Sequence, residues 1–227
     1  YGEVFLKPIH GSLGLGIVHI LMQGKHLYAH YNTPYGRSRR QTFLSLRQLL
    51  NQLIPKKNHL YMVQQGIKLI RYRGSPVDFR AHMHKNAQGK WMLTALSAKV
   101  AGKGSVTTHA RTGGEFKSPS QMLMAAFGDE RRVQAALQEL ARVSQEVCSC
   151  LEQVEKGPIG ELGLDLGVDV AGRVWLFEVN AKPGRHVFAV PWMRQSGWRS
   201  AQYLMEYAKL LSGFEPQESA LQEGMNA

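Results

Sequence analysis

The 227-residue chain is long enough for one large domain or two small ones with a proper core. Its 44% hydrophobic and 20% charged residues are typical of a soluble globular protein, and no apolar run approaches the about 18 residues of a membrane span. The net charge of +11 favours an anionic partner such as a nucleotide, an acidic peptide or nucleic acid. Two neighbouring cysteines, Cys148 and Cys150, cannot easily bridge within a helix, which favours a reduced, cytoplasmic setting.

The first part of the chain predicts a small sheet and a helix. Three strands are expected at residues 4–9, 17–23 and 26–31. A polar stretch follows, and its basic segment RSRR (37–40) predicts a solvated loop. Nucleic-acid binding is only a minor alternative, because the segment lacks the aromatic residues on which single-stranded bases stack. Apolar residues at helical spacing predict a helix over 42–54, and LYMVQQGI (60–67) predicts a strand that crosses between two lobes.

The second part predicts antiparallel strands covered by helices. Strands are expected at residues 67–74, 77–85, 90–102, 162–170 and 173–180, with the last two forming a hairpin across Ala171 and Gly172. TTHARTGGEF (107–116) predicts a loop, Asp129 to Val154 a long amphipathic helix, and residues 203–211 a closing helix before a polar tail. This arrangement predicts an α+β fold.

HGSLGLG (10–16) is a glycine-rich turn between two predicted strands. Such a turn can point backbone N–H groups at a phosphate, and Lys7 on the preceding strand can add a positive charge. A plain hairpin is the alternative interpretation. The segment lacks the Gly-Lys-Ser/Thr ending of a Walker loop and does not open a predicted helix.

Three oxygen-bearing side chains converge on the predicted hairpin. Glu178 and Asn180 lie two positions apart on one strand and therefore share a face, while pairing with the neighbouring strand can bring Asp165 to the same face. Two carboxylates and an amide are ligands suited to a hard cation such as Mg²⁺. The alternative is a solvated strand end followed by a turn. Asp169, next to the turn, is expected to be solvated and to play no part in metal binding.

VDFRAHMHK (77–85) places four polar side chains on one strand face. Asp78 either forms a cross-strand salt bridge or holds Arg80 towards a phosphoryl oxygen. His82 and His84 continue the face, and a zinc site is a minor alternative because no third ligand lies at suitable spacing.

The order of FLKP, the glycine-rich turn, YMVQQG, DFR, a GG loop, LGLDLGVD and FEVNAKPGR resembles the ATP-grasp superfamily over nearly the whole chain. VQQGI, VDFR, GLDLGVD and GRVWLFEVNAKPGR resemble its spore-coat-associated YheC/YheD branch more narrowly. The resemblance implies two α+β lobes of mostly antiparallel sheets with the nucleotide cleft between them. The expected divisions are a smaller lobe over 1–66, a larger lobe over 67–213 and a tail over 214–227.

The resemblance also implies ATP and Mg²⁺ as cofactors, with Mn²⁺ as an alternative cation. The implied nucleotide contacts are Lys7, Gly11, Ser12, Gly14, Gly16, Gln64, Gln65, Gly66 and Ile67. Asp165, Glu178 and Asn180 would match the metal ligands, while Lys7, Arg80 and Arg185 would act on the transferred phosphate or the acceptor. Gln64 stands where relatives commonly have Glu, and His109 where they often have Asn.

The expected activity is that of an ADP-forming carboxylate–amine ligase whose carboxylate and amine the sequence does not specify. The alternative is an ATP-binding structural or coat-associated protein with little catalysis, which would extend the expected cytoplasmic location to the spore. Because the chain begins within a predicted strand, it is expected to be part of a longer protein. The resemblance implies that the missing part includes an N-terminal substrate-binding domain. Nucleic-acid and membrane partners are not expected.

Overall fold

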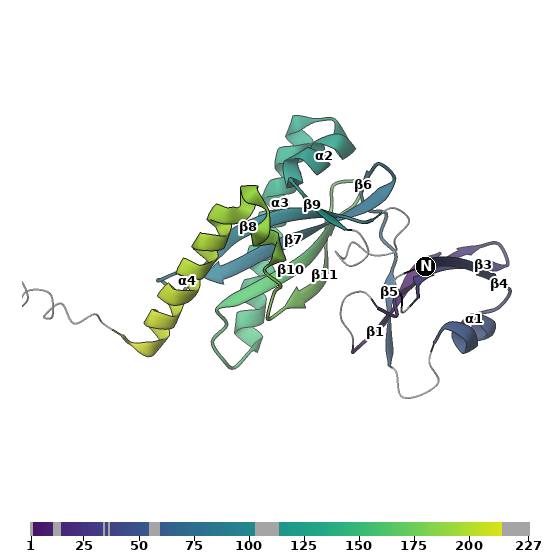
Figure 1. The fold of residues 1–227 in the computed structure, drawn as a ribbon, viewed down its shortest axis with the longest axis horizontal. Coiled ribbons are helices and arrows are strands. Elements are labelled where there is room, and N and C mark those ends of the chain that lie inside the picture. The colour runs from purple at the N-terminus through teal and green to yellow at the C-terminus, as the bar shows by residue number, and fades with distance from the viewer. Residues whose placement is uncertain are drawn as a thin grey trace, which may run out of the picture. The chain divides into compact units, whose positions relative to one another are not determined.

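The structure, a computed structural model, describes residues 2–10, 15–33, 35, 37–54, 60–102 and 114–214. The chain splits into two compact units, each made of three segments. The first unit contains Tyr1–Arg80, Ser97–Glu139 and Leu166–Phe177, and the second contains Ala81–Leu96, Leu140–Asp165 and Glu178–Ala227. Helices and antiparallel strands build both, in keeping with the predicted α+β class (Figure 1).

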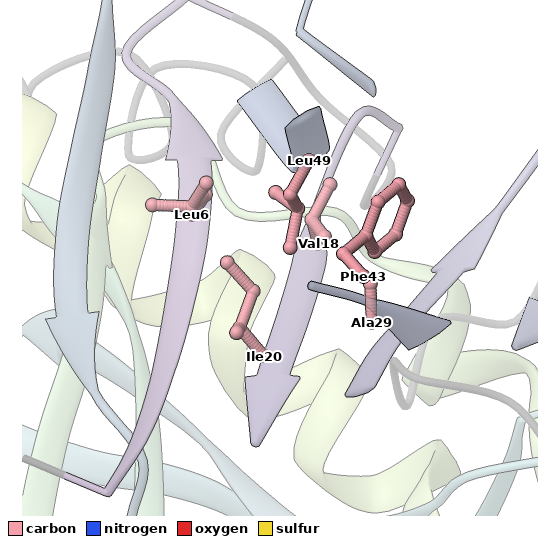
Figure 2. Packing of buried hydrophobic residues seen from close by; sticks show 6 residues of the cluster. All are labelled: Leu6, Val18, Ile20, Ala29, Phe43 and Leu49. Atoms are coloured by element: carbon pink, nitrogen blue, oxygen red, sulfur yellow. The ribbon is translucent and has the colours of Figure 1, made fainter. Parts of the chain in front are cut away.

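A five-stranded antiparallel sheet lies in the first unit, in the order β4-β3-β2-β1-β5. Its strands are β1 (Glu3–Pro8), β2 (Val18–Gln23), β3 (His26–Asn32), β4 (Ser38–Phe43) and β5 (Tyr61–Gln65). Alternating strand residues and one residue of α1 (Leu46–Leu53) form its hydrophobic core, shown in Figure 2: Leu6, Val18, Ile20, Ala29, Phe43 and Leu49.

The predictions that β1, β2, β3 and β5 are strands are confirmed, but those for residues 37–54 need two corrections. The RSRR segment is largely strand rather than loop, because β4 pairs with β3 along its whole length. The helix begins at Leu46 rather than at residue 42. Ser45 has an extended backbone and accepts a hydrogen bond from the Gln48 N–H, which fixes the helix start after the strand.

The second sheet has the order β11-β10-β7-β8-β9, with β6 paired to β7. Its strands are β6 (Arg71–Tyr72), β7 (Ser75–Lys85), β8 (Trp91–Val100), β9 (Glu115–Lys117), β10 (Glu161–Val168) and β11 (Val174–Asn180). The β7–β8 meander and the β10–β11 hairpin are thus confirmed. The strand expected at 67–74 is reduced to the two residues of β6 and a bridge at Leu69, and β9 was not predicted.

The helices of the second part are α2 (Pro119–Phe127), α3 (Glu130–Val154) and α4 (Arg194–Ser212), with two 3-10 turns at His186–Ala189 and Pro191–Met193. The prediction of α3 is confirmed, α2 was missed, and α4 begins earlier than residue 203. Figure 1 shows α4 in front of β7 and β8 and α3 behind them. Among the described residues, no helix has both the length and the apolar character needed to cross a bilayer.

Candidate functional site

The predicted nucleotide contacts that the structure describes lie on β1, on β5 and beside them. Lys7 pairs with Met62, and Gln64 and Gln65 pair with Phe5 and Val4 in the register of the two strands. The Lys7 Nζ atom lies 5.8 Å from the centroid of the Phe177 ring. The register therefore makes Lys7 and the two glutamines part of one antiparallel ladder.

Gly66 directly follows β5 and lies in close contact with the start of β1. Its N–H donates to the Glu3 carbonyl oxygen at 2.9 Å, and a Cβ atom at this position would lie 2.4 Å from the Glu3 Cγ atom. The close approach requires glycine. Ile67 continues into a tight turn closed by the Leu69 N–H and the Ile67 carbonyl. Gly16 has a left-handed backbone with φ of 75°, which glycine adopts at little cost.

Four predicted residues of interest fall outside the described part of the chain. They are Gly11, Ser12 and Gly14 of the glycine-rich turn, and His109 of the TTHARTGG loop. Their assignments remain predictions.

The β10–β11 hairpin brings Asp165 and Asn180 together. The Asn180 Nδ2 atom donates to the Asp165 Oδ2 atom at 3.3 Å and lies 3.5 Å from the Gly163 carbonyl oxygen. Glu178 precedes Asn180 by two positions on β11, and its side chain is exposed. Strand alternation therefore places Glu178 and Asn180 on one face of β11.

This donor set fits a hard divalent cation. Asp165 and Glu178 offer carboxylate oxygens, and Asn180, whose amide nitrogen contacts Asp165, has its amide oxygen left as a ligand atom. Across the described residues, no group of three His, Cys, Asp or Glu side chains could hold a metal ion. Oxygen ligands suit Mg²⁺ better than metals that prefer nitrogen and sulfur ligands, and the assignment of the three residues to Mg²⁺ remains a prediction.

Asp169 is buried, which corrects the expectation that it is solvated. Its Oδ1 atom accepts hydrogen bonds from the backbone N–H groups of Ala171 and Arg173, each at 2.9 Å. Its Oδ2 atom accepts from Arg173 Nε and Trp175 Nε1, each at 3.0 Å. Burial raises the pKa of Asp169, but these hydrogen bonds outweigh it and bring the pKa below its usual value. Asp169 therefore closes the β10–β11 turn.

Asp78 on β7 forms an ion pair with Lys99 on β8, with 3.2 Å between Oδ1 and Nζ. Both side chains are largely buried, so this pair is less screened than one on the surface. The structure thus shows the cross-strand alternative predicted for Asp78. Arg80, two positions along β7, is half-buried, and its action on a phosphoryl group remains a prediction.

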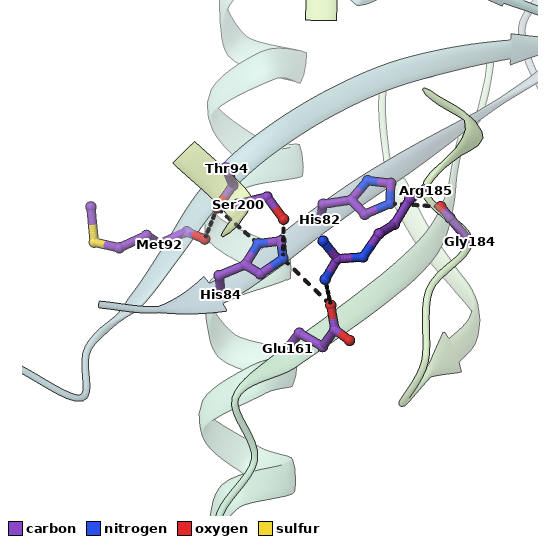
Figure 3. A network of polar contacts seen from close by, with 8 residues as sticks. All are labelled: His82, His84, Met92, Thr94, Glu161, Gly184, Arg185 and Ser200. Atoms are coloured by element: carbon purple, nitrogen blue, oxygen red, sulfur yellow. Dashed lines mark hydrogen bonds and ion pairs between the residues drawn. The ribbon is translucent and has the colours of Figure 1, made fainter. Parts of the chain in front are cut away.

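The two histidines of β7 belong to a polar network, drawn in Figure 3. His84, whose side chain is 1% exposed, contacts Thr94 Oγ1 at 2.9 Å through Nδ1 and Ser200 Oγ at 2.8 Å through Nε2. The Glu161 Oε2 atom lies 3.6 Å from the same Nε2 atom. The sequence analysis missed this network, because only the spacing of the histidines was visible and Ser200 and Glu161 lie far away in the chain.

Arg185 is positioned by the same part of the fold. Its Nη2 atom donates to Glu161 Oε2 at 2.9 Å, and the preceding residue, Gly184, has its carbonyl oxygen 3.2 Å from His82 Nε2 (Figure 3). The His82 ring also packs against the Phe188 ring, with 4.9 Å between centroids. The segment after β11 is thereby tied to β7 and β10.

Burial, together with the positive neighbours His82 and Arg185, lowers the pKa of His84 from 6.5 to about 4. The unfolded chain therefore binds a proton that folded His84 excludes, and stability should fall as the pH drops from 6.5 to about 4. The loss should reach about 3 kcal/mol, at about 1.4 kcal/mol for each pKa unit. Urea unfolding over this pH range measures it.

Two variants isolate the contribution of His84. His84→Gln should be less stable at neutral pH and should lack this part of the pH dependence. His26→Gln, at an exposed histidine of β3, should keep the wild-type dependence. Equal pH dependence in wild type and His84→Gln would show that another group is responsible.

Comparisons of the sequence with a family model and with curated proteins point to the same family. Residues 1–211 match the family described as YheC/D like ATP-grasp. The chain is 34% identical over 221 residues to the endospore coat-associated protein YheD of Bacillus subtilis (strain 168), covering 93% of this chain and 46% of that protein. It is 26% identical over 182 residues to YheC of the same strain, covering 79% of this chain and 48% of that protein. The chain thus spans about half the length of these curated relatives.

Two solved structures are similar to the chain at low sequence identity. The first is N5-carboxyaminoimidazole ribonucleotide synthetase from Thermotoga maritima, with a TM-score of 0.43 and 10% identity over 90% of this chain and 39% of that one. The second is the C-terminal domain of the ATP-grasp enzyme Pby1 from K. lactis, with a TM-score of 0.47 and 13% identity over 96% of this chain and 60% of that one.

Proposed function

Because the chain belongs to the YheC/D-like ATP-grasp family and has its α+β fold, we propose that it is an ATP- and Mg²⁺-dependent ligase. It activates a carboxylate as an acyl phosphate for attack by an amine. The observation that carries the proposal is the hairpin that brings Asp165 and Asn180 within 3.3 Å, with Glu178 on the same strand as Asn180. In this proposal residues 1–66 are the smaller lobe, 67–213 the larger lobe and 214–227 a tail.

The protein residues have separate roles. Lys7 and the glycine-rich turn neutralise and hold the phosphates, and the backbone of residues 64–67 contacts adenine. Asp165, Glu178 and Asn180 hold Mg²⁺, or Mn²⁺ in its place. The cation supplies charge neutralisation at the phosphates. Arg80 and Arg185 stabilise the negative charge on the transferred phosphoryl group, because catalysis of this transfer depends mainly on positioning and electrostatics.

The reaction has two balanced steps. A carboxylate oxygen of the substrate bonds to the γ-phosphorus of ATP while the bond to the bridging oxygen breaks, and ADP leaves. The amine nitrogen then bonds to the acyl carbon, inorganic phosphate leaves, and the amine loses a proton to solvent. The products are ADP, phosphate and an amide.

The test is nucleotide turnover with pools of carboxylates and amines. ADP formation over many turnovers should require one member of each pool together, because a carboxylate alone can give no more than about one ADP per site before the acyl phosphate accumulates. Inorganic phosphate and the amide product should each form in the same amount as ADP. If AMP is the only nucleotide product, the acyl-phosphate mechanism is wrong.

The names of the relatives favour a second candidate. YheD and YheC are endospore coat-associated proteins, so this chain can instead be a nucleotide-binding structural protein of the spore with little turnover. The net charge of +11 suits packing against acidic partners. Calorimetry that shows ATP and Mg²⁺ binding, together with no ADP from any substrate pool, would favour this candidate over the ligase.

A further inference from the structure

A small open cavity lies beside the first turn of α4 in the second unit. Its volume is about 310 Å³, and it is lined by Arg185, Phe188, Arg194, Gly197 and Trp198. We propose that this cavity binds the carboxylate substrate, and that the substrate is a small monocarboxylate carrying a flat apolar group such as an aromatic ring. The inference rests on the proposed ligase function, for which it names the substrate class.

The charges in the cavity select an anion with a single negative charge. Arg185 and Arg194 bring two guanidinium groups, and Glu161 compensates one of them through its 2.9 Å contact with Arg185. Within the described part of the chain, no acidic side chain forms an ion pair with Arg194. One positive charge is therefore left, which a carboxylate neutralises and which a guanidinium can bind through two parallel hydrogen bonds.

The N-terminal end of α4 also favours a negatively charged ligand in the cavity. α4 begins at Arg194, and its N-cap residue, Met193, makes no side-chain hydrogen bond to the first turn. A helix of this length carries a partial positive charge at its N-terminus. The Arg194 side chain and the helix end thus both favour an anion in the cavity.

The aromatic side chains select the group attached to the anion. Trp198 is 80% exposed, although a side chain of this size is highly buried in most proteins. Gly197 beside it permits close packing, because a Cβ atom there would lie 3.0 Å from Phe188 Cβ. Phe188 and Trp198 thereby form apolar walls next to the two arginines, and a flat ring can stack on them.

The size of the cavity limits the ligand. Its volume is at the lower end of the about 300–1,000 Å³ that is typical of small-molecule sites, so it suits a single ring or an amino-acid-sized acid. The cavity is open, and a fragment of this size should therefore bind with millimolar affinity in the absence of nucleotide.

Binding of phenylacetate to the chain tests the proposal. The protein is labelled with 5-fluorotryptophan, and the fluorine resonance of residue 198 is assigned with Trp198→Phe. Phenylacetate should shift this resonance with saturation. Acetate should bind roughly tenfold more weakly because it lacks the ring, and phenethylamine, with the opposite charge, should not bind.

Matched variants separate the cavity from the general positive charge of the protein. Arg194→Gln should weaken phenylacetate binding roughly tenfold. Arg199→Gln, at an exposed arginine of α4 that does not line the cavity, should leave it unchanged. Trp198→Ala should reduce the affinity for phenylacetate to that for acetate, and calorimetry measures both affinities in this variant. Equal weakening by Arg194→Gln and Arg199→Gln, or no saturable shift with phenylacetate, would overturn the proposal.

ATP binding, measured on the same samples, keeps this proposal distinct from the proposed function. If ATP and Mg²⁺ bind but phenylacetate does not, the cavity assignment is wrong and the ligase proposal stands. If phenylacetate binds as described but aromatic carboxylates never support ADP formation with any amine, the cavity is an anion site and its role in the reaction is wrong.

Discussion

Replacement of Glu178 by glutamine is expected to remove most of the Mg²⁺-dependent strengthening of ATP binding. The substitution keeps the size of the side chain but removes one negative charge from a ligand set of two carboxylates and an amide, and the number of ligand charges controls affinity for hard cations. At limiting Mg²⁺ the Kd for ATP should rise at least roughly tenfold, and turnover should fall with it. Calorimetric titration of ATP at several Mg²⁺ concentrations measures the effect.

Stability and a matched control show whether the effect is local. Glu178 is exposed, so its replacement should hardly change the urea midpoint. Asp165→Asn should weaken Mg²⁺-dependent binding as Glu178→Gln does. Glu155→Gln, at an exposed carboxylate just after α3, should bind as wild type does. If Glu178→Gln and wild type bind ATP equally at limiting Mg²⁺, the hairpin does not hold the cation.

The largest loss of stability is expected for Asp169→Ala. The side chain is 6% exposed and accepts four hydrogen bonds, two from backbone N–H groups of the turn and two from the side chains of Arg173 and Trp175. Its removal leaves the Trp175 indole N–H and the turn without an acceptor. The free energy of unfolding should fall by about 2–3 kcal/mol, as expected when hydrogen bonds to a buried charged group are lost. Urea unfolding at neutral pH measures this loss.

Asp129→Ala is the control for Asp169→Ala. Asp129 is exposed and accepts one hydrogen bond, from the Arg131 N–H at the start of α3, so its removal should cost much less. Asp169→Asn should also destabilise the protein, because its amide nitrogen replaces an oxygen that accepts hydrogen bonds. ATP affinity at saturating Mg²⁺ should not change in any of the three folded variants. A loss of stability no larger in Asp169→Ala than in Asp129→Ala would contradict the role of Asp169 in the turn.

The hairpin could be predicted because the information is local. Alternating side chains define the shared face of Glu178 and Asn180, and the short Ala171–Gly172 turn determines that the two strands pair. Asp169 was misjudged for a related reason. An acid beside a turn is usually solvated, and only the structure shows that the indole of Trp175 and the side chain of Arg173 cover it.

Other features depend on contacts that the sequence does not display. The first half of α4 is polar apart from Trp198, so apolar spacing identified only the part after residue 203. In the structure, this half of α4 contacts β7 through Ser200, which lies more than one hundred positions from its partner His84 in the sequence. The end of β4 was missed because Thr42 and Phe43 also fit the helical spacing of the residues that follow. In the structure, their pairing with β3 outweighs this helical preference.

The strand β4 has a consequence for how copies of the protein behave in solution. It occupies one end of the order β4-β3-β2-β1-β5, and within the described residues no further strand pairs with its outer side. An uncovered sheet edge can join to the same edge of another copy and so begin aggregation. Arg39 and Arg40 are exposed on this strand and point to opposite faces, so an antiparallel pairing of two such edges at these residues would place two guanidinium groups on each face. The repulsion weakens with salt, so the colloidal stability of the protein should depend on ionic strength through this edge.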